Sequence, residues 1–148
     1  MTQVDGAPGA LLVIISGPSG VGKDTIIEAM KALPDGDDYR YVVTCTTRTP
    51  RPGEVDGVSY RFLDRERFGS LRDDGELLEW AEVHGNWYGT PRDQVRDSLA
   101  AGRHAILKID VQGAQKVKEA VADALLIFVI PPTLEDLFAR LQIGRAHV

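Results

Sequence analysis

The feature that most restricts the fold of this chain is a glycine-rich loop set between an apolar run and a helical pattern. Residues 11–15 form an apolar run without alternation, which is typical of a strand buried on both faces of a parallel sheet. The run leads into the pattern Gly17-x4-Gly22-Lys23, and apolar residues follow at helical spacing, at Ile26, Ile27, Met30 and Leu33. A strand, a glycine loop and a helix in this order gather backbone N–H groups at one helix N-terminus, which predicts an anion site.

The later part of the chain repeats the alternation of strands and helices. Residues 105–109 read as a second buried strand, and helical spacing follows at 114–121. Residues 125–130 are the most apolar run, and Thr133 is placed to cap a helix after it. Alternating strands and helices predict an α/β fold with a mainly parallel sheet.

A different pattern separates these two parts. Short alternating pieces with aromatic residues predict a small antiparallel or mixed sheet, with a short helix at Asp64–Arg72. Thr90-Pro91 is typical of an N-cap and first helical turn, and predicts a helix to Ala101. The predicted division is a flexible leader at 1–9, core segments at 10–35 and 91–141, and an insert at about 36–90.

Composition limits the classes of function. The 148 residues are 43% hydrophobic and 26% charged, which fits one soluble globular domain. A net charge of -5 argues against general affinity for nucleic acid or an anionic membrane, so an anionic ligand would need locally clustered cations. The single cysteine, Cys45, excludes an intrachain disulfide and a multi-cysteine zinc site. Without an apolar run near the roughly 20 residues of a membrane span, the sequence predicts a cytoplasmic protein. It indicates no oligomeric state.

The glycine loop carries an unusual residue at its eighth position. Glycines let the backbone approach phosphate oxygens, and Lys23 can reach the terminal phosphates, so the loop predicts ATP binding. Asp24 stands where a hydroxyl usually contacts Mg²⁺; it is a candidate Mg²⁺ ligand, or a helix-start acid that offsets the helix dipole. The predicted ATP-binding residues are Gly17, Pro18, Ser19, Gly20, Val21, Gly22, Lys23, Asp24 and Thr25.

A basic segment follows in this acidic chain. Residues 39–53 contain Arg40, Arg48 and Arg51 and no acidic residue. Guanidinium groups grip phosphate bidentately, which makes the segment a candidate anion clamp. A solvated basic turn shaped by its prolines is the alternative, and composition alone leaves both open.

Four segments together resemble guanylate kinases. They are Thr44–Phe62, Leu78–Ala81, Gly85–Thr90 and Ile109–Gly113, and the resemblance extends over residues 11–141. It implies a P-loop nucleoside monophosphate kinase-like fold, with a mainly parallel sheet and a small mixed GMP-binding insert. It also implies the reaction ATP + GMP ⇌ ADP + GDP, in purine nucleotide metabolism, with Mg²⁺ as the cofactor that accompanies ATP.

The resemblance also implies roles for single residues. Lys23, Arg48 and Arg51 are the implied catalytic residues. Glu79 is the implied guanine reader, because one carboxylate can accept from both the N1–H and N2–H donors of guanine. The implied GMP-binding residues are Thr44, Arg48, Arg51, Tyr60, Glu79, Tyr88, Thr90 and Asp110.

Two other functions stay open from the sequence. One is a non-catalytic guanylate-kinase-like binding module, against which the intact Gly17, Gly22 and Lys23 argue. The other is a P-loop kinase for a phosphorylated sugar, in which Glu79 and Asp110 would have no purpose.

The last residues depart from the family pattern. Residues 142–148 read QIGRAHV, and we expect this segment to be non-native. We also expect the chain to be truncated, without the lid arginines and adenine-site residues of the family. Whether the chain alone is active stays open from the sequence.

Overall fold

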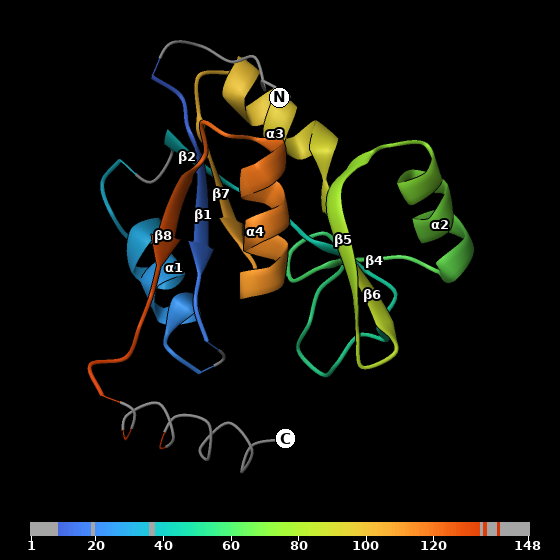
Figure 1. Cartoon of the computed structure of the whole chain (residues 1–148), viewed down its shortest axis with the longest axis horizontal. Coiled ribbons are helices and arrows are strands. Elements are labelled where there is room, and N and C mark those ends of the chain that lie inside the picture. The colour runs from blue at the N-terminus through green and yellow to red at the C-terminus, as the bar shows by residue number, and fades with distance from the viewer. Residues whose placement is uncertain (1–8, 19, 36–37, 134, 136–138, 140–148) are drawn as a thin grey trace.

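The computed structural model describes residues 9–18, 20–35, 38–133, 135 and 139, and the arrangement below concerns these residues (Figure 1). The elements in chain order are β1 (Leu12–Ser16), α1 (Lys23–Lys31), β2 (Tyr39–Tyr41), β3 (Cys45–Thr46), β4 (Arg61–Phe62), α2 (Arg65–Asp73), β5 (Leu77–Val83), β6 (Asn86–Pro91), α3 (Arg92–Ala100), β7 (His104–Lys108), α4 (Val111–Ala120) and β8 (Leu125–Phe128). Several predictions lie outside the described residues: the leader at 1–8, Ser19, most of the helix expected after Thr133, and the segment 142–148.

A parallel sheet in the order β2-β7-β1-β8 forms the core. β1 pairs on both sides, with Val13 opposite Ile106 of β7 and opposite Leu125 of β8. Figure 1 shows α1 and α4 on opposite faces of this sheet. Both faces of β1 are therefore covered, which explains why its sequence does not alternate.

The two faces of β1 pack against different helices. Leu12 and Ile14 belong to a buried cluster that includes residues of α3 and α4. Val13 and Ile15 pack on the other face with Ile27 of α1. The glycine loop leaves β1 between these two layers, at the carboxyl end of the strand, where α/β sheets bind ligands.

A second sheet, in the order β4-β3-β6-β5, lies beside the core. β3 and β4 are parallel, whereas β6 is antiparallel to both β3 and β5. Phe68 of α2 is fully buried against Cys45 and Leu77. This small cluster packs α2 onto the mixed sheet, and it confirms the short helix expected there.

The predicted α/β class, with a mainly parallel sheet and a mixed second sheet, is confirmed. Two local predictions are wrong. Thr90 lies in β6, and Pro91 is the N-cap residue of α3, without a side-chain cap hydrogen bond. Tyr39 was expected in the insert, yet β2 pairs with β7 in the parallel sheet, with Tyr39 opposite His104. The other boundaries of the core and insert stay a prediction.

The most apolar run of the chain is also the least buried strand. The side chains of Leu125, Leu126, Ile127 and Phe128 are 47%, 40%, 43% and 47% exposed. In the described part of the chain β8 is an edge strand, paired with β1 alone. No helix among the described residues is long and apolar enough to span a membrane.

Candidate active site

The glycine loop closes tightly around the end of β1. Gly20 and Gly22 have φ angles of 78° and 107°, in the region that favours glycine. A Cβ at Gly17 would lie 2.3 Å from the carbonyl oxygen of Val129, so only glycine fits there. α1 begins at Lys23 without a side-chain cap, as expected where backbone N–H groups are to receive an anion.

The side chain of Lys23 folds back over this loop. Its Nζ donates to the carbonyl oxygen of Gly17 at 2.9 Å. Burial is the main cause that lowers the pKa of Lys23, and the positive charge of Lys108 lowers it further. The negative charges of Asp110 and Asp24 act in the opposite direction. The phosphate loop is therefore within electrostatic reach of groups on β7 and α4.

A cleft of about 270 Å³ opens between the loop and the mixed sheet. Its lining includes six of the predicted site residues: Lys23, Thr44, Tyr60, Glu79, Tyr88 and Asp110. Lys108, Ile109 and Gly113 line it as well. The fold thus joins the lysine of the predicted ATP loop and most of the implied GMP-binding residues in one cavity.

An irregularity in β5 aims Glu79 into this cleft. Leu77 pairs with Pro91, and Glu79 pairs with Thr90, so that Leu78 is an extra residue in the register. Leu77 and Leu78 are only 7% and 8% exposed, although neighbouring strand residues normally point to opposite faces. Each leucine enters a different buried cluster, and the bulge places the next side chain in the cleft.

The carboxylate of Glu79 is held in place by its neighbours. Thr90 Oγ1 donates to Glu79 Oε1 at 2.9 Å. Burial raises the pKa of the Glu79 carboxyl, and the charge of Asp110 adds to the increase, whereas Thr90 and the charge of Lys116 oppose it. A Cβ at Gly113 would lie 3.4 Å from Oε2, so the glycine leaves room beside this oxygen.

Asp110 is fixed near Glu79, since a Cβ at Gly113 would lie 3.3 Å from Asp110 Oδ1 and 3.4 Å from Glu79 Oε2. It is the N-cap residue of α4, and its Oδ1 accepts from the backbone N–H of Gly113 at 2.8 Å. One carboxylate from β5 and one from the start of α4 therefore face the same space.

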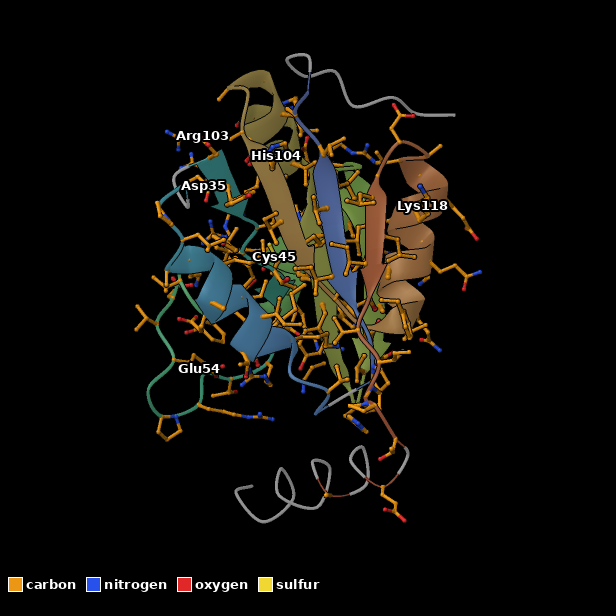
Figure 2. All side chains as sticks on the ribbon, turned by 90° about the vertical axis from the view of Figure 1, so that its left-hand side faces the viewer. Asp35, Cys45, Glu54, Arg103, His104 and Lys118 are labelled. Atoms are coloured by element: carbon orange, nitrogen blue, oxygen red, sulfur yellow. The ribbon has the colours of Figure 1, made fainter. Side chains whose placement is uncertain are left out.

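Arg48 is held by a partner that the sequence analysis missed. Its two terminal nitrogens donate to the two carboxylate oxygens of Glu54 at 2.8 and 2.9 Å. Glu54 also accepts from the backbone N–H of Arg51 at 2.7 Å. The bonds from Arg48 and Arg51 lower the pKa of Glu54 to about 2, and the same pair raises the pKa of Arg48. Figure 2 shows Glu54 on a loop at the lower left, well below His104, where β7 begins.

Two tyrosines connect Arg48 to the cleft. The rings of Tyr60 and Tyr88 lie 6.1 Å apart between centroids, and both line the cavity. The guanidinium carbon of Arg48 lies 5.0 Å from the Tyr60 ring centroid. Arg48 therefore stands behind Tyr60, at the edge of the site.

Several predicted residues lie outside the cleft lining. Arg51 and Thr25 are exposed and do not line the cleft. Thr90 is fully buried behind Glu79 and acts on the site through it. Arg40, the third arginine of the basic segment, lines a separate depression with Asp93 and Asp97.

Asp24 is paired in the structure. Nζ of Lys108 donates to Asp24 Oδ1, which links α1 to the end of β7. Lys108 was not among the site residues predicted from the sequence. Its position at the end of a buried strand, two residues before Asp110, could have indicated that it lies near the site. Among the described residues, no three His, Cys, Asp or Glu side chains are grouped to hold a metal ion. Mg²⁺ fits this site only with phosphate oxygens and water as further ligands, which is its usual mode of binding.

Comparisons with known proteins agree with this geometry. The guanylate kinase family model matches residues 10–146. The guanylate kinase of Bordetella pertussis is 47% identical over 137 residues, which cover 92% of this chain and 62% of the relative. That of Symbiobacterium thermophilum is 51% identical over 134 residues, covering 90% of this chain and 63% of the relative. The chain therefore spans less than two thirds of the length of these relatives.

A solved structure gives the same result. The fold matches the crystal structure of guanylate kinase from Anaplasma phagocytophilum with a TM-score of 0.75 and 37% sequence identity. The match covers 93% of this chain and 69% of that one. A family model that spans nearly the whole chain, close relatives and a shared fold lead to one conclusion: the chain belongs to the guanylate kinase family.

Proposed function

We propose that the protein transfers the γ-phosphoryl group of ATP to GMP, giving ADP and GDP. The observation that carries the proposal is the shared cleft, lined both by Lys23 of the glycine loop and by the partly buried carboxylate of Glu79. A lysine in such a loop suits a triphosphate, and a fixed carboxylate suits a base with paired N–H donors. The family membership and the names of the relatives support the same reaction.

Glu79 would select guanine over adenine. Thr90 fixes one of its oxygens, and Asp110 supplies a second acceptor in the same cleft. Guanine presents adjacent N1–H and N2–H donors to these acceptors, whereas adenine has an acceptor at N1 and would leave the carboxylate unpaired. Sites of this kind reject the wrong analogue by factors on the order of 10⁴.

Arg48, Tyr60 and Tyr88 would bind the acceptor phosphate. Tyr60 and Tyr88 line the cleft, and the guanidinium of Arg48 lies 5.0 Å from the Tyr60 ring centroid. Arg48 is already ordered by its two bonds to Glu54, which limits the conformational entropy lost on binding. Arg51 is the second proposed phosphate ligand, and because it is exposed here it would turn inward when the nucleotide binds.

The transfer needs no general base. The second pKa of a phosphate monoester is near 6, so the GMP phosphate is mostly dianionic at neutral pH. One of its oxygens forms a bond to the γ-phosphorus, while the bond from that phosphorus to the β,γ-bridging oxygen breaks and ADP leaves with the electron pair. Lys23 and the arginines position the two nucleotides and neutralise their charge.

Mg²⁺ would accompany ATP and neutralise part of the phosphate charge. Asp24 is the proposed protein ligand, through the carboxylate oxygen that does not accept from Lys108. ATP and GMP are the proposed partners, and their chemistry together with the single cysteine supports a cytoplasmic location. The net charge of -5 gives no support for a nucleic-acid or membrane partner.

A coupled assay of the full-length protein, with ATP and GMP, AMP or ribose 5-phosphate, tests the proposal. We expect turnover of GMP to exceed that of AMP by a factor on the order of 10⁴. Lys23→Ala should abolish turnover and leave GMP affinity largely unchanged in calorimetry, because Lys23 acts on the donor phosphates. Turnover of ribose 5-phosphate would support a sugar-phosphate kinase instead. GMP binding without any turnover would support a binding module.

A further inference from the structure

The pair of Asp24 and Lys108 joins the phosphate loop to the acceptor side of the cleft. We propose that Lys108 is a further phosphate-binding cation of the transfer step, beside Lys23 and the arginines, and that Asp24 is the positioning residue that holds its ammonium group over the cleft. The inference rests on the proposed function and adds one residue to its machinery.

The packing of α1 on the parallel sheet brings the two residues together. Ile106 and Lys108 are two residues apart on β7 and therefore point to the same face of the sheet. Ile106 packs against Ile27 of α1 on that face. Asp24 lies three residues before Ile27, on the same side of the helix. Along the interface between β7 and α1, the buried apolar contact of Ile106 with Ile27 is therefore followed by the ion pair of Lys108 with Asp24.

The backbone fixes how far Lys108 lies from the phosphate loop. β1 and β7 pair in parallel with Ile15 opposite Lys108. The backbone N–H of Ile109 donates to the carbonyl oxygen of Ile15 at 3.2 Å. Ile15 stands two residues before Gly17, where the loop begins. Strand register thus carries Lys108 to the edge of the sheet where the nucleotides would meet.

Two lysines and two aspartates lie at this edge of the parallel sheet. Lys23, Lys108 and Asp110 line the cleft, and Asp24 stands beside them. Lys23 of the phosphate loop and Lys108 at the end of β7 face one cavity, although they lie far apart in the sequence. Two ammonium groups this close repel each other in the free protein, whereas a phosphate between them attracts both. The arrangement suits an anionic ligand.

Stability does not account for the pair. The side chains of Lys108 and Asp24 are 41% and 83% exposed, and ion pairs this exposed contribute little to folding. Lys108 also ends a strand whose preceding three residues are fully or almost fully buried. A lysine there, next to a second lysine, needs Asp24 to hold it in one position, and a held ammonium group is what phosphate binding requires.

The test compares Lys108→Met, Lys108→Arg and Asp24→Asn in the full-length protein at saturating Mg²⁺. The control is Lys31→Met, because Lys31 is also an ion-paired lysine, bound to Glu28 at 3.4 Å on α1, but lies outside the cleft. We expect Lys108→Met to lower kcat by about 100-fold, the effect of removing one transition-state donor. The KM for GMP should change by less than about 3-fold, and Lys108→Arg should recover part of kcat.

Asp24 should act through Lys108. Asparagine keeps one side-chain oxygen for the proposed Mg²⁺ contact, so at saturating Mg²⁺ the effect of Asp24→Asn reports on Lys108. We expect kcat to fall by about 10-fold in the wild-type background but by less than about 2-fold in Lys108→Met, since the two losses then share one group. Additive losses would overturn the positioning role. A Lys108→Met protein with wild-type kcat, or one whose loss of kcat is matched by a loss of thermal stability, would overturn the role of Lys108.

A binding measurement separates this inference from the proposed function. A wild-type protein that fails to phosphorylate GMP contradicts the proposed function. Independently of turnover, Lys108→Met should bind inorganic pyrophosphate about 10-fold more weakly than wild type in calorimetry, while Lys31→Met binds it normally. Equal pyrophosphate affinity in all three proteins would overturn the assignment of Lys108 as a phosphate ligand.

Discussion

Glu79 shows, at the scale of one residue, that a side chain suited to ligand binding can lower the stability of the fold. Burial raises the pKa of its carboxyl, so the folded protein disfavours the ionised form that guanine would need. The hydrogen bond from Thr90 offsets part of this cost and fixes the direction of the carboxylate. A carboxylate that is desolvated and already oriented contributes more binding free energy when it accepts hydrogen bonds from two N–H donors.

The substitution Glu79→Gln should separate binding from stability. The amide keeps an oxygen that can accept from Thr90, and it removes the partly buried charge. It also replaces one acceptor by a donor, which would face an N–H of guanine. We therefore expect the KM for GMP to rise by about 100-fold, while the thermal unfolding midpoint at neutral pH does not fall. Steady-state kinetics and thermal unfolding measure the two effects.

The stability difference between these proteins should depend on pH. Because the pKa of Glu79 is raised in the folded state, the folded protein binds this proton more tightly than the unfolded chain does. The contribution of this group to stability is complete below its unfolded pKa and is lost as pH rises through its folded pKa. The advantage of Glu79→Gln should therefore grow from acid to neutral pH. A difference that is constant over this range would contradict the raised pKa.

At the scale of an element, the glycine loop depends on the strand beside it. Gly17→Ala would bring a Cβ to 2.3 Å from the Val129 carbonyl oxygen, so the loop or the end of β8 must move. We expect the free energy of unfolding to fall by roughly 1–3 kcal/mol and the KM for ATP to rise. Urea unfolding and kinetics measure these changes.

Gly69→Ala is the matched control for that substitution. Gly69 lies inside α2, and a Cβ there would meet only a terminal nitrogen of Arg72, at 3.6 Å. Alanine in a helix should raise the free energy of unfolding by roughly 0.5–1 kcal/mol. Equal urea midpoints for Gly17→Ala and the wild type would show that the loop tolerates a side chain.

The sequence predicts an element well where a local pattern decides its structure. The unalternating run at 11–15, the glycines after it and the helical spacing from Ile26 agree on β1, the loop and α1. Thr90 was assigned wrongly because a Thr-Pro pair favours a cap locally, whereas pairing with β5 holds it in a strand. Tyr39 was assigned wrongly because its short strand is ordered by β7, far away in the sequence.

The same distinction applies to the site. Motif residues such as Lys23 and Glu79 can be recognised from the order of residues, and the fold brings both to one cleft. Glu54 lies in the family-like segment Thr44–Phe62 but had no assigned role, and Lys108 belongs to none of the recognised segments. Their roles come from bonds to Arg48 and Asp24 that form only in the folded chain. The bulge that buries two successive leucines before Glu79 is likewise a result of pairing between strands.

At the scale of the whole molecule, helices α3 and α4 join the mixed sheet to the core. α4 packs against both β1 and β5. Gln94 of α3 clamps the backbone of Val43, accepting from its N–H at 2.8 Å and donating to its carbonyl oxygen at 3.1 Å. Val43 directly precedes Thr44 in the cleft lining, so this clamp sets the acceptor side relative to the phosphate loop.

Gln94→Leu should weaken the attachment of Val43 to α3. The substitution leaves both backbone groups of Val43 without their partner, and we expect the free energy of unfolding to fall by roughly 1–3 kcal/mol. The KM for GMP should rise more than that for ATP, because the change acts on the acceptor side. Gln115→Leu, at an exposed position of α4, is the control and should leave both unchanged. Equal changes in the KM values for GMP and ATP would contradict an effect confined to the GMP side of the cleft.

The contact between Gly17 and Val129 makes the phosphate loop sensitive to mechanical load. The backbone N–H of Val129 donates to the carbonyl oxygen of Ser16 at 2.8 Å. The carbonyl oxygen of Val129 fills the space beside Gly17. The residue that follows β8 is therefore in direct contact with the first peptide of the loop. Tension at Pro131 would change the shape of the cradle in which a triphosphate would rest, so the chain after β8 acts as a lever on the donor site.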